Sequence, residues 1–537
     1  MFRTTCCIII IILGLPGTGC ESQESDPKTQ PFDMNSDSDA DTDSDTDSDT
    51  DTDSDTDSDT DTDSDTDSDT DTDSDTDSDT DSDTDSDSDA DSDTDTDTGT
   101  SSSAKDSDND GLSDTYEIAN GLDPNDEDTD GDGVPDLVEV VSGTDPTDDT
   151  SNPSAQGDFY FLVPFEEDPE PSQDTLTFAT DLQQADVFIL IDTTSSMVGE
   201  IENLQNSLTA TNGIIDQIGQ IIPDVWFGIG HYDDYPKFPY GTGAWGDVVF
   251  RLDQRMTDNA TSAQTAVDSL TTHDGGDVPE STIPALWATA TGDGLGNYLA
   301  AQTACASGEI GYPCFRDNSI PIIMLITDAT FHNGPGNVNN YNIATAPKYN
   351  DAVTALNDIH AKVLSIFSGM VVTPNGLAHC KAISTDTGAV DSLGNPLTFT
   401  VTDTGVGLDT EVVDAVQSLA QDVPIDISAT ARDDTTDAVD ATIFIDRIVP
   451  HSSSSPGCTG GLQVSDTNSD GIPDIFLGVL PGNPVCFDIF PKENITIPAA
   501  KEPQVFKAYI DIVGENVTVL DTREIYFLVP PSDPLIV

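Results

Sequence analysis

Basic residues are scarce in this sequence. Its 537 residues include 16 Lys and Arg against 103 Asp and Glu, which gives a formal net charge of −87. Nucleic acid is therefore excluded as a partner, because binding to phosphate groups requires positive charge. Divalent cations are the natural counter-ions of so acidic a chain.

The sequence has few histidines, and the common catalytic motifs are missing from it. The six histidines are not accompanied by a Gly-x-Ser-x-Gly, His-Glu-x-x-His or phosphate-binding loop sequence. His332, just after the candidate metal ligand Asp328, is expected to pack near that ligand or to support it. We therefore expect a binding or structural protein rather than an enzyme.

Long apolar runs are missing, except for a short one near the start of the chain. Residues 8–15 follow Arg3, are too short to span a bilayer permanently, and predict a signal peptide over residues 1–19. The small residues before Cys20 resemble a bacterial lipoprotein cleavage site, although Gly17 stands where that family usually has a larger aliphatic residue. The resemblance implies an exported protein, lipidated at Cys20 and anchored at the bacterial outer membrane or cell surface. An ordinary signal peptide is the alternative.

Cysteines are also few, and no Cys-x-x-Cys or Cys/His cluster suggests a zinc site. In an exported protein most cysteines are expected to pair. Closeness in sequence favours a Cys305–Cys314 disulfide, and a Cys458–Cys486 disulfide would leave Cys380 unpaired.

Residues 20–104 are predicted to form a disordered acidic stalk. Every odd-numbered residue from Asp37 to Asp97 is Asp, and the residues between them are Ser, Thr or Ala. Such a tract has nothing to bury, and its self-repulsion keeps it extended. Its composition is similar to the serine–aspartate stalks of bacterial surface adhesins. A generic acidic linker is the alternative, and either would provide reach.

Two calcium-loop patterns follow within residues 105–150. Each has Asp at loop positions 1, 3, 5 and 9, Gly at position 6, a backbone carbonyl at position 7 and Glu at position 12, which together can wrap one calcium ion. The predicted calcium ligands are Asp106, Asp108, Asp110, Leu112, Asp114 and Glu117 in the first loop, and Asp128, Asp130, Asp132, Val134, Asp136 and Glu139 in the second.

With the Gly-x-Asp-Pro sequences at 121–124 and 143–146, these loops resemble bacterial thrombospondin type 3 repeats. The resemblance implies a spacer that calcium makes rigid, and a regulatory calcium switch is the alternative. A poorer third copy begins at Asp466 but has Leu477 at position 12. It is either a further site or a polar turn.

Between residues 185 and 434, apolar runs alternate with amphipathic helices. The runs are predicted to be strands buried on both faces, and they span 187–191, 225–229, 320–326 and 363–367. The helices have apolar residues at three-to-four spacing over 201–222, 353–359 and 412–419. This alternation predicts an α/β fold, a doubly wound parallel sheet, with its site at the carboxyl ends of the strands.

Hydroxyl and carboxylate side chains follow the first of these strands in an Asp-x-Thr-x-Ser pattern. The pattern resembles the metal-ion-dependent adhesion site of von Willebrand factor A domains. The segments Asp277-Val-Pro-Glu280 and Thr327-Asp-Ala329 resemble the integrin β-subunit version of that domain. The resemblance implies a Mg²⁺ or Mn²⁺ ion held by Asp192, Thr194, Ser196, Glu280 and Asp328, with a further hydroxyl from Ser281 or Thr282.

The integrin resemblance also implies metal sites on either side of this ion. Asp234, Asp277, Glu280 and the carbonyl of Pro279 fit a second metal site. The family's Asn falls on Gly275, and Asp274 is a candidate substitute. At the third site the family has two consecutive acids, and this sequence has Gly199 followed by the single acid Glu200. Surface charge is the alternative explanation for Asp233, Asp234 and Glu200.

Residues 436–532 contain short β-like runs separated by Pro, Gly and Asn turns, which predicts a β-sandwich. The runs expected to be strands are 441–444, 487–490, 505–513, 517–520 and 525–528. Residues 174–181 look like the strand that precedes the integrin β A domain, and the sequence of 159–164 is similar to that of 526–530. We therefore predict one sandwich, made of 158–184 and 436–532, which the A domain interrupts. A separate C-terminal sandwich is the alternative.

The expected function is metal-dependent adhesion, or ligand binding, at the cell surface. The A-domain metal would capture an acidic group, an exposed carboxylate, of a protein partner. The alternative is a calcium-stiffened structural component of the cell envelope with a permanent partner.

Overall fold

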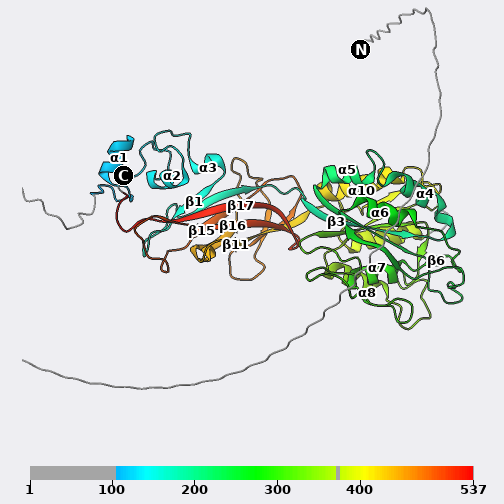
Figure 1. The fold of residues 1–537 in the computed structure, drawn as a ribbon. Coiled ribbons are helices and arrows are strands. Elements are labelled where there is room, and N and C mark those ends of the chain that lie inside the picture. Colours follow the sequence, from blue (N-terminus) through cyan, green and yellow to red (C-terminus); the bar gives the residue numbers. More distant parts are fainter. Residues whose placement is uncertain (1–104, 370–374, 536–537) are drawn as a thin grey trace, which may run out of the picture. The chain divides into compact units, whose positions relative to one another are not determined.

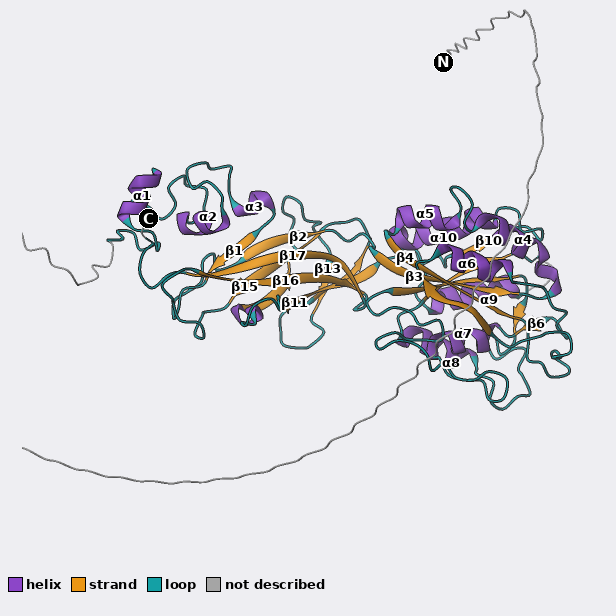
Figure 2. Cartoon of the chain, viewed as in Figure 1, coloured by secondary structure: helices purple, strands orange, loops and turns teal. Residues whose placement is uncertain are grey.

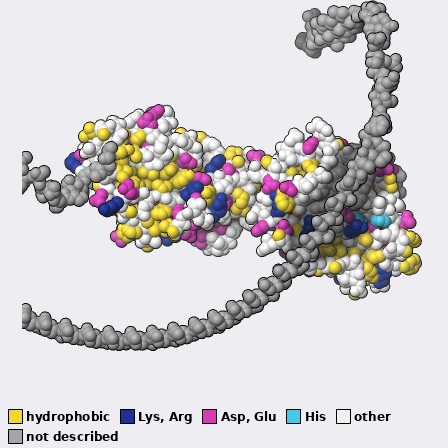
Figure 3. Space-filling view, in the orientation of Figure 1, with side chains coloured by type: hydrophobic (Ala, Val, Ile, Leu, Met, Phe, Trp, Pro, Cys, Tyr) yellow, Lys and Arg dark blue, Asp and Glu magenta, His cyan; other side chains and the backbone are white. Residues whose placement is uncertain are grey.

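The computed structural model describes residues 105–369 and 375–535. The predicted signal peptide (1–19), the lipidation site Cys20 and the acidic stalk (20–104) lie outside the described residues. No helix among the described residues is long and apolar enough to cross a membrane. On the face that Figure 3 shows, Lys and Arg side chains are few, in keeping with the small number of basic residues in the sequence.

The repeat segment forms short helices between loops (Figure 1). Its helices are α1 (Asp114–Asn120), α2 (Asp136–Ser142) and α3 (Pro153–Gln156). A small apolar cluster holds the segment together and joins it to strand β17 (Thr518–Val529). Its buried members are Leu112, Leu122, Leu137, Val138 and Leu528. The repeats are therefore packed against the sandwich.

The α/β domain (residues 184–423) contains a six-stranded sheet in the order β10-β9-β7-β3-β4-β5. The strands are β3 (Gln184–Asp192), β4 (Asp224–Tyr232), β5 (Arg251–Thr257), β7 (Ile320–Thr327), β9 (Lys362–Phe367) and β10 (Thr398–Thr400). Five are parallel, but β5 runs antiparallel to β4. The prediction of an all-parallel sheet is therefore wrong at this edge. The polar, half-exposed residues of β5 have no apolar run that would have revealed it.

Helices cover both faces of this sheet (Figure 1). One face carries α4 (Val198–Ser207), α5 (Ile214–Ile221), α6 (Ala260–Asp268) and α10 (Leu408–Asp422), and the other carries α7 (Thr282–Thr291), α8 (Tyr349–Asp358) and α9 (Gly376–Asp386). Alternate residues of β3 explain the two layers, because Ile189 packs in one core and Phe188 in the other. The single helix predicted over 201–222 is broken into α4 and α5.

Two further sheets face each other in the sandwich (Figure 2). The six-stranded sheet has the order β1 (Phe159–Leu162), β17 (Thr518–Val529), β16 (Gln504–Gly514), β11 (Ile425–Asp433), β14 (Ile475–Val479) and β13 (Gln463–Ser465). The three-stranded sheet has the order β12 (Ile445–Pro450), β15 (Val485–Pro491) and β2 (Asp174–Phe178). Phe476 and Phe487, from different sheets, have ring centroids 5.2 Å apart.

Strands from before and after the α/β domain share these sheets. β1 pairs with β17 in parallel, with Phe159 opposite Ile525, and β2 pairs with β15 antiparallel. Each sheet of the sandwich thus takes one strand from the chain that precedes the α/β domain.

The predicted boundary at residue 434 is wrong. β11 pairs with β16 from Ile427 to Asp433 and so belongs to the sandwich. No turn-rich linker separates the α/β domain from the sandwich here, because α10 ends at Asp422 and β11 begins at Ile425. Residues Ala441–Phe444, expected to be a strand, form a short 3₁₀ helix, η2.

Both expected disulfides are confirmed. Cys305 is bonded to Cys314, and Cys458 is bonded to Cys486. Cys380 is a buried free thiol.

Candidate metal centre

The candidate site lies where β3 and β7 end. Asp192, the last residue of β3, is fully buried. A small parallel pair, β6 (Pro279–Glu280) and β8 (Thr330–Phe331), brings Glu280 beside the segment that follows Asp328. Polar side chains from three distant segments therefore converge at one edge of the sheet, as the topology of a parallel sheet predicts.

Hydrogen bonds hold the Asp192 carboxylate in place. Its Oδ1 accepts from the backbone N–H of Thr194 at 2.9 Å and from Thr194 Oγ1 at 2.7 Å. Its Oδ2 accepts from Thr327 Oγ1 at 2.8 Å. Burial, together with the neighbouring charge of Asp328, raises the pKa of Asp192 to about 7.

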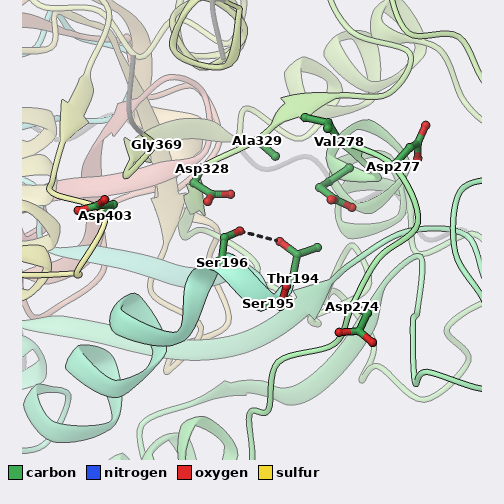
Figure 4. A pocket seen from close by; sticks show the side chains of 11 residues that line it. Thr194, Ser195, Ser196, Asp274, Asp277, Val278, Asp328, Ala329, Gly369 and Asp403 are labelled. Carbon is green, nitrogen blue, oxygen red and sulfur yellow. Dashed lines mark hydrogen bonds between the residues drawn. The ribbon is translucent and has the colours of Figure 1, made fainter. Parts of the chain in front are cut away.

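The other four predicted ligands line a common cavity of about 520 Å³ (Figure 4). They are Thr194, Ser196, Glu280 and Asp328. The Thr194 and Ser196 hydroxyl oxygens lie 3.5 Å apart, and the carboxylate of Asp328 faces them in Figure 4. A Cβ atom added to Gly275 would lie 3.5 Å from both Glu280 Oε1 and Thr194 Cγ2. The five predicted residues are therefore brought together.

Glu280 carries the clearest sign of a cation site. The residue is 4% exposed, and its Oε2 has no hydrogen-bond partner. Burial, with the nearby charges of Asp192 and Asp234, raises its pKa well above the usual range. A buried oxygen without a partner is costly unless something compensates it. No Lys or Arg is among the described residues that line the cavity, so a metal ion fits the need.

The chemistry of the donor set suits a small hard cation. Carboxylate and hydroxyl oxygens are the ligands that Mg²⁺ and Mn²⁺ prefer. Ser281 and Thr282, by contrast, do not line the cavity. The Ser281 hydroxyl donates to the Val249 carbonyl at 2.7 Å, and the Thr282 hydroxyl bonds to Tyr232 at 3.1 Å. The expected extra hydroxyl ligand is therefore not supplied by either residue.

The cavity has two further acidic lining residues, Asp274 and Asp403. Sequence reasoning indicated Asp274 only as a substitute ligand of the second site and did not indicate Asp403 at all. Asp403 belongs to a loop packed against Gly199, where a Cβ atom would lie 2.6 Å from the Thr404 carbonyl. No motif in the sequence marks Asp403, because its place depends on this contact between distant segments.

The second predicted metal site contains a histidine. His332 Nε2 lies 3.4 Å from Asp234 Oδ2 and 3.2 Å from Asp277 Oδ1, so it lies between the two acids. Burial, opposed by a hydrogen bond from Tyr341, raises the pKa of Asp234 to about 8. Pro279, whose carbonyl was a predicted ligand, opens β6. His332 therefore contacts two predicted ligands of the second site rather than Asp328, the ligand near which it was expected to pack.

Glu200, the one acid assigned to the third site, is 1% exposed. Burial raises its pKa. The alternative explanation, that Glu200 is a surface charge, is therefore wrong.

Both calcium loops have the same internal hydrogen bonds. Asp106 accepts from the N–H groups of Asn109 and Gly111 at 2.7 and 3.2 Å. Asp128 accepts equivalently from Gly131 and Gly133 at 2.9 and 2.8 Å. Gly111 and Gly133, at loop position 6, have φ of 99° and 96°, a left-handed conformation that favours glycine. Leu112 and Val134, at position 7, donate their N–H groups to Asp110 and Asp132.

The acidic side chains of each loop converge. Carboxylate oxygens from positions 1, 3 and 5 lie within 4.8 Å of one another in both loops. Several buried oxygens have no hydrogen-bond partner, and they belong to Asp108, Asp110, Asp114 and Glu117 in the first loop and to Asp130 and Glu139 in the second. Burial and neighbouring aspartates raise the pKa of Glu117 to about 7 and that of Glu139 to about 8. A calcium ion would relieve this repulsion.

The loops are not identical in detail. Asp114 lies 2.6 Å from Lys105 Nζ, whereas Asp136 accepts hydrogen bonds from the N–H and hydroxyl of Thr129 at 2.9 and 2.7 Å. The Asp132 carboxylate accepts from the Asn152 amide at 2.7 Å. The third, poorer loop repeats the pattern, since Asp466 accepts from Ser469 and Gly471 at 2.7 and 2.8 Å. It still lacks an acid at position 12.

A comparison with protein families supports the prediction of two thrombospondin type 3 repeats. A family model described as Bacterial TSP3 repeat matches residues 106–127 and 128–149, which supports calcium binding by both loops. No curated protein matches the chain.

Solved structures give weak similarities. A von Willebrand factor type A protein from Catenulispora acidiphila has 11% identity and a TM-score of 0.31, over 70% of this chain and 72% of that chain. The pilus adhesin SpaC from Lactobacillus rhamnosus GG, in its open conformation, has 10% identity and a TM-score of 0.29, over 66% of this chain and 45% of that chain. Proximal thread matrix protein 1 from the mussel byssus has 12% identity and a TM-score of 0.25, over 46% and 48%. This chain spans less than half of the last two proteins.

Proposed function

We propose that this protein is a metal-dependent adhesion or ligand-binding protein of the cell surface. Mg²⁺ or Mn²⁺ would be held by Asp192, Thr194, Ser196, Glu280 and Asp328. The observation that carries the proposal is the unpartnered oxygen of buried Glu280, which faces the same cavity as two hydroxyls and a second acid.

The proposed ligand is a carboxylate on a protein partner. Without a cation, the acidic lining of the cavity would repel an anion. With a cation bound, the two neutral hydroxyl ligands would leave part of its positive charge for an outside carboxylate. The bound metal would thus both attract the partner and fix the position of its acidic side chain, which is binding rather than catalysis.

The other segments suit this role. The calcium repeats would make the connection to the binding domain rigid, and the acidic stalk would provide reach. A lipid anchor at Cys20 would hold the chain to the membrane, at the bacterial outer membrane or cell surface.

A second candidate function is structural. Backbone hydrogen bonds join the first calcium loop to the C-terminal segment, with Ser113 N–H donating to Leu535 O at 3.1 Å and Leu535 N–H to Gly111 O at 2.9 Å. This contact would join the calcium repeats rigidly to the rest of the chain, as a calcium-stiffened envelope component requires. The permanent partner of such a component remains part of the proposal.

The test is peptide capture with and without metal. An array of peptides containing Asp or Glu, each matched by its Asn or Gln version, is probed with the protein in Mg²⁺, in Mn²⁺ and in EDTA. We expect capture of a subset of acidic peptides that needs both the carboxylate and the metal. Asp192→Asn should abolish it, whereas Asp268→Asn on the exposed side of α6 should not.

Capture that persists in EDTA and in Asp192→Asn would rule out the metal mechanism. A single envelope protein that co-purifies at fixed stoichiometry, and stays bound in EDTA, would favour the structural role.

A further inference from the structure

Two histidines and an aspartate converge beside Thr193, in the loop that carries Thr194 and Ser196, outside the site described above. His231 lies near the end of β4, Asp233 follows that strand, and His273 lies in the loop after α6. One ligand atom from each lies within 4.8 Å of the others. These residues take no part in the predicted metal sites.

Asp233 is fixed at the centre of this cluster. It is fully buried, and its Oδ1 accepts a hydrogen bond from Thr193 Oγ1 at 2.7 Å. Its Oδ2 accepts from the Val248 N–H at 3.2 Å and lies 3.0 Å from His273 Nδ1. That separation is compatible with two ligand atoms that each lie about 2.0–2.2 Å from one ion.

His231 is oriented by a second carboxylate. The histidine is 5% exposed, and its Nδ1 lies 2.6 Å from Asp253 Oδ2. With the Nδ1 proton donated to Asp253, Nε2 keeps its lone pair for a metal ion. A carboxylate that holds the other ring nitrogen is the usual support of a metal-bound histidine.

The carboxylates around the cluster bring negative charge that a divalent cation would neutralise. Asp233 and Asp253 bring two carboxylates, and Arg251, which lies 3.3 Å from Asp253, has a side chain that is 65% exposed. Imidazole with carboxylate suits zinc and related transition metals, unlike the all-oxygen set around Asp192.

We propose that His231, Asp233 and His273 form a transition-metal site of the zinc class, with Asp253 as its positioning residue. The His273 side chain is 19% exposed, which gives the ion a path from solvent. A water molecule would complete the coordination.

This site is attached directly to the main cavity. The His273 N–H donates to Thr193 O at 2.8 Å, and His273 forms a backbone bridge with Thr194, whose hydroxyl lines that cavity. The chain continues from His273 to Asp274 and Asp277, which also line it. A bound ion would therefore tie this loop to β4 and stiffen one wall of the cavity. The site itself does not depend on the function proposed for that cavity.

The test is a zinc titration of the full chain. The protein is stripped of metal and saturated with Ca²⁺ and Mg²⁺ to fill the oxygen-ligand sites. Zn²⁺ is then titrated against a chromophoric chelator, and the X-ray absorption edge of the bound zinc is recorded. We expect one tight equivalent whose spectrum shows two imidazole ligands. Loss of a ligand in His273→Gln should weaken it by about 100-fold or more, and Asp253→Asn by about 10- to 100-fold.

The matched control is His451→Gln. His451 also lies 3.0 Å from a carboxylate, that of Asp488, but belongs to none of the metal-ligand clusters among the described residues. This control should bind zinc like the wild type, and calcium uptake should verify folding in every variant. No tight equivalent in the wild type, a spectrum without two imidazoles, or unchanged affinity in folded His273→Gln would overturn the proposal.

Discussion

Thr327 donates a hydrogen bond of 2.8 Å to Asp192 Oδ2, and so ties the end of β7 to the end of β3. The same hydroxyl oxygen accepts from the Ala329 N–H at 3.1 Å, just beyond Asp328. Thr327 therefore sets the position of two predicted metal ligands, although it does not line the cavity.

Thr327→Val should weaken Mn²⁺ binding by about tenfold or more, because supporting contacts typically contribute 10- to 100-fold to metal affinity. The variant should also be less stable by about 1–3 kcal/mol, since Asp192 loses a buried hydrogen bond. Electron paramagnetic resonance of free Mn²⁺ measures the affinity. Thr327→Ser keeps the hydroxyl and serves as the control. Equal affinity in the Val and Ser variants would show that the hydrogen bond does not matter.

Calcium removal should make stability fall as pH rises. In the metal-free fold, the pKa of Asp110 is raised to about 7 and that of Glu139 to about 8 by burial and neighbouring aspartates, from ordinary values of 3.8 and 4.5. The folded repeats thus bind more protons than the unfolded chain. The stabilisation that these protons provide is complete below about pH 4 and is lost progressively as the pH rises to about 8. Calorimetry in EDTA should show the repeat transition moving to lower temperature over this range.

Saturating calcium should remove most of that pH dependence, because the ion replaces the protons. Glu139→Gln should flatten the EDTA curve, since the amide cannot ionise. A repeat transition in EDTA that rises with pH would contradict the assignment of these shifts.

Leu112→Ala should loosen the repeats from the sandwich without removing a calcium ligand. The Leu112 side chain is fully buried in the cluster that includes Leu528, whereas position 7 binds calcium through its carbonyl. Truncation of such a side chain costs about 2–5 kcal/mol. Hydrogen exchange should become faster near residues 105–125 and 525–535, while two calcium ions still bind.

The matched control for that variant is Val134→Ala, at position 7 of the second loop, where the side chain is only partly buried. It should have the smaller effect. Slower or unchanged exchange in Leu112→Ala would mean that this cluster does not hold the repeats.

Gly199→Ala should displace the loop that carries Asp403. The added Cβ would lie 2.6 Å from the Thr404 carbonyl, so either α4 or the loop must move, at a cost of about 1–3 kcal/mol. Gly219→Ala, in α5 with nothing within 4 Å, should instead stabilise the protein by about 0.5–1 kcal/mol. Urea unfolding of both variants measures the difference, and equal effects would count against the close contact.

Local sequence was sufficient for the calcium loops and for part of the main site. The ligands of each loop lie within one short segment, so their spacing alone predicts how they converge. The hydroxyls of Thr194 and Ser196 were equally predictable, because they follow a strand whose buried residues form one apolar run. The Cys305–Cys314 disulfide was predictable from closeness in the chain.

Tertiary structure decided the remaining features. β11 joined the sandwich and β5 ran antiparallel because hydrogen-bond partners between distant segments depend on how the whole core packs. Asp403 and His332 acquired their places in the same way. The cluster of His231, Asp233 and His273 exists because β3 lies next to β4 in the sheet and the loop after α6 returns to Thr193. Hydrophobic periodicity encodes which residues are buried, but it does not encode which strand lies beside which.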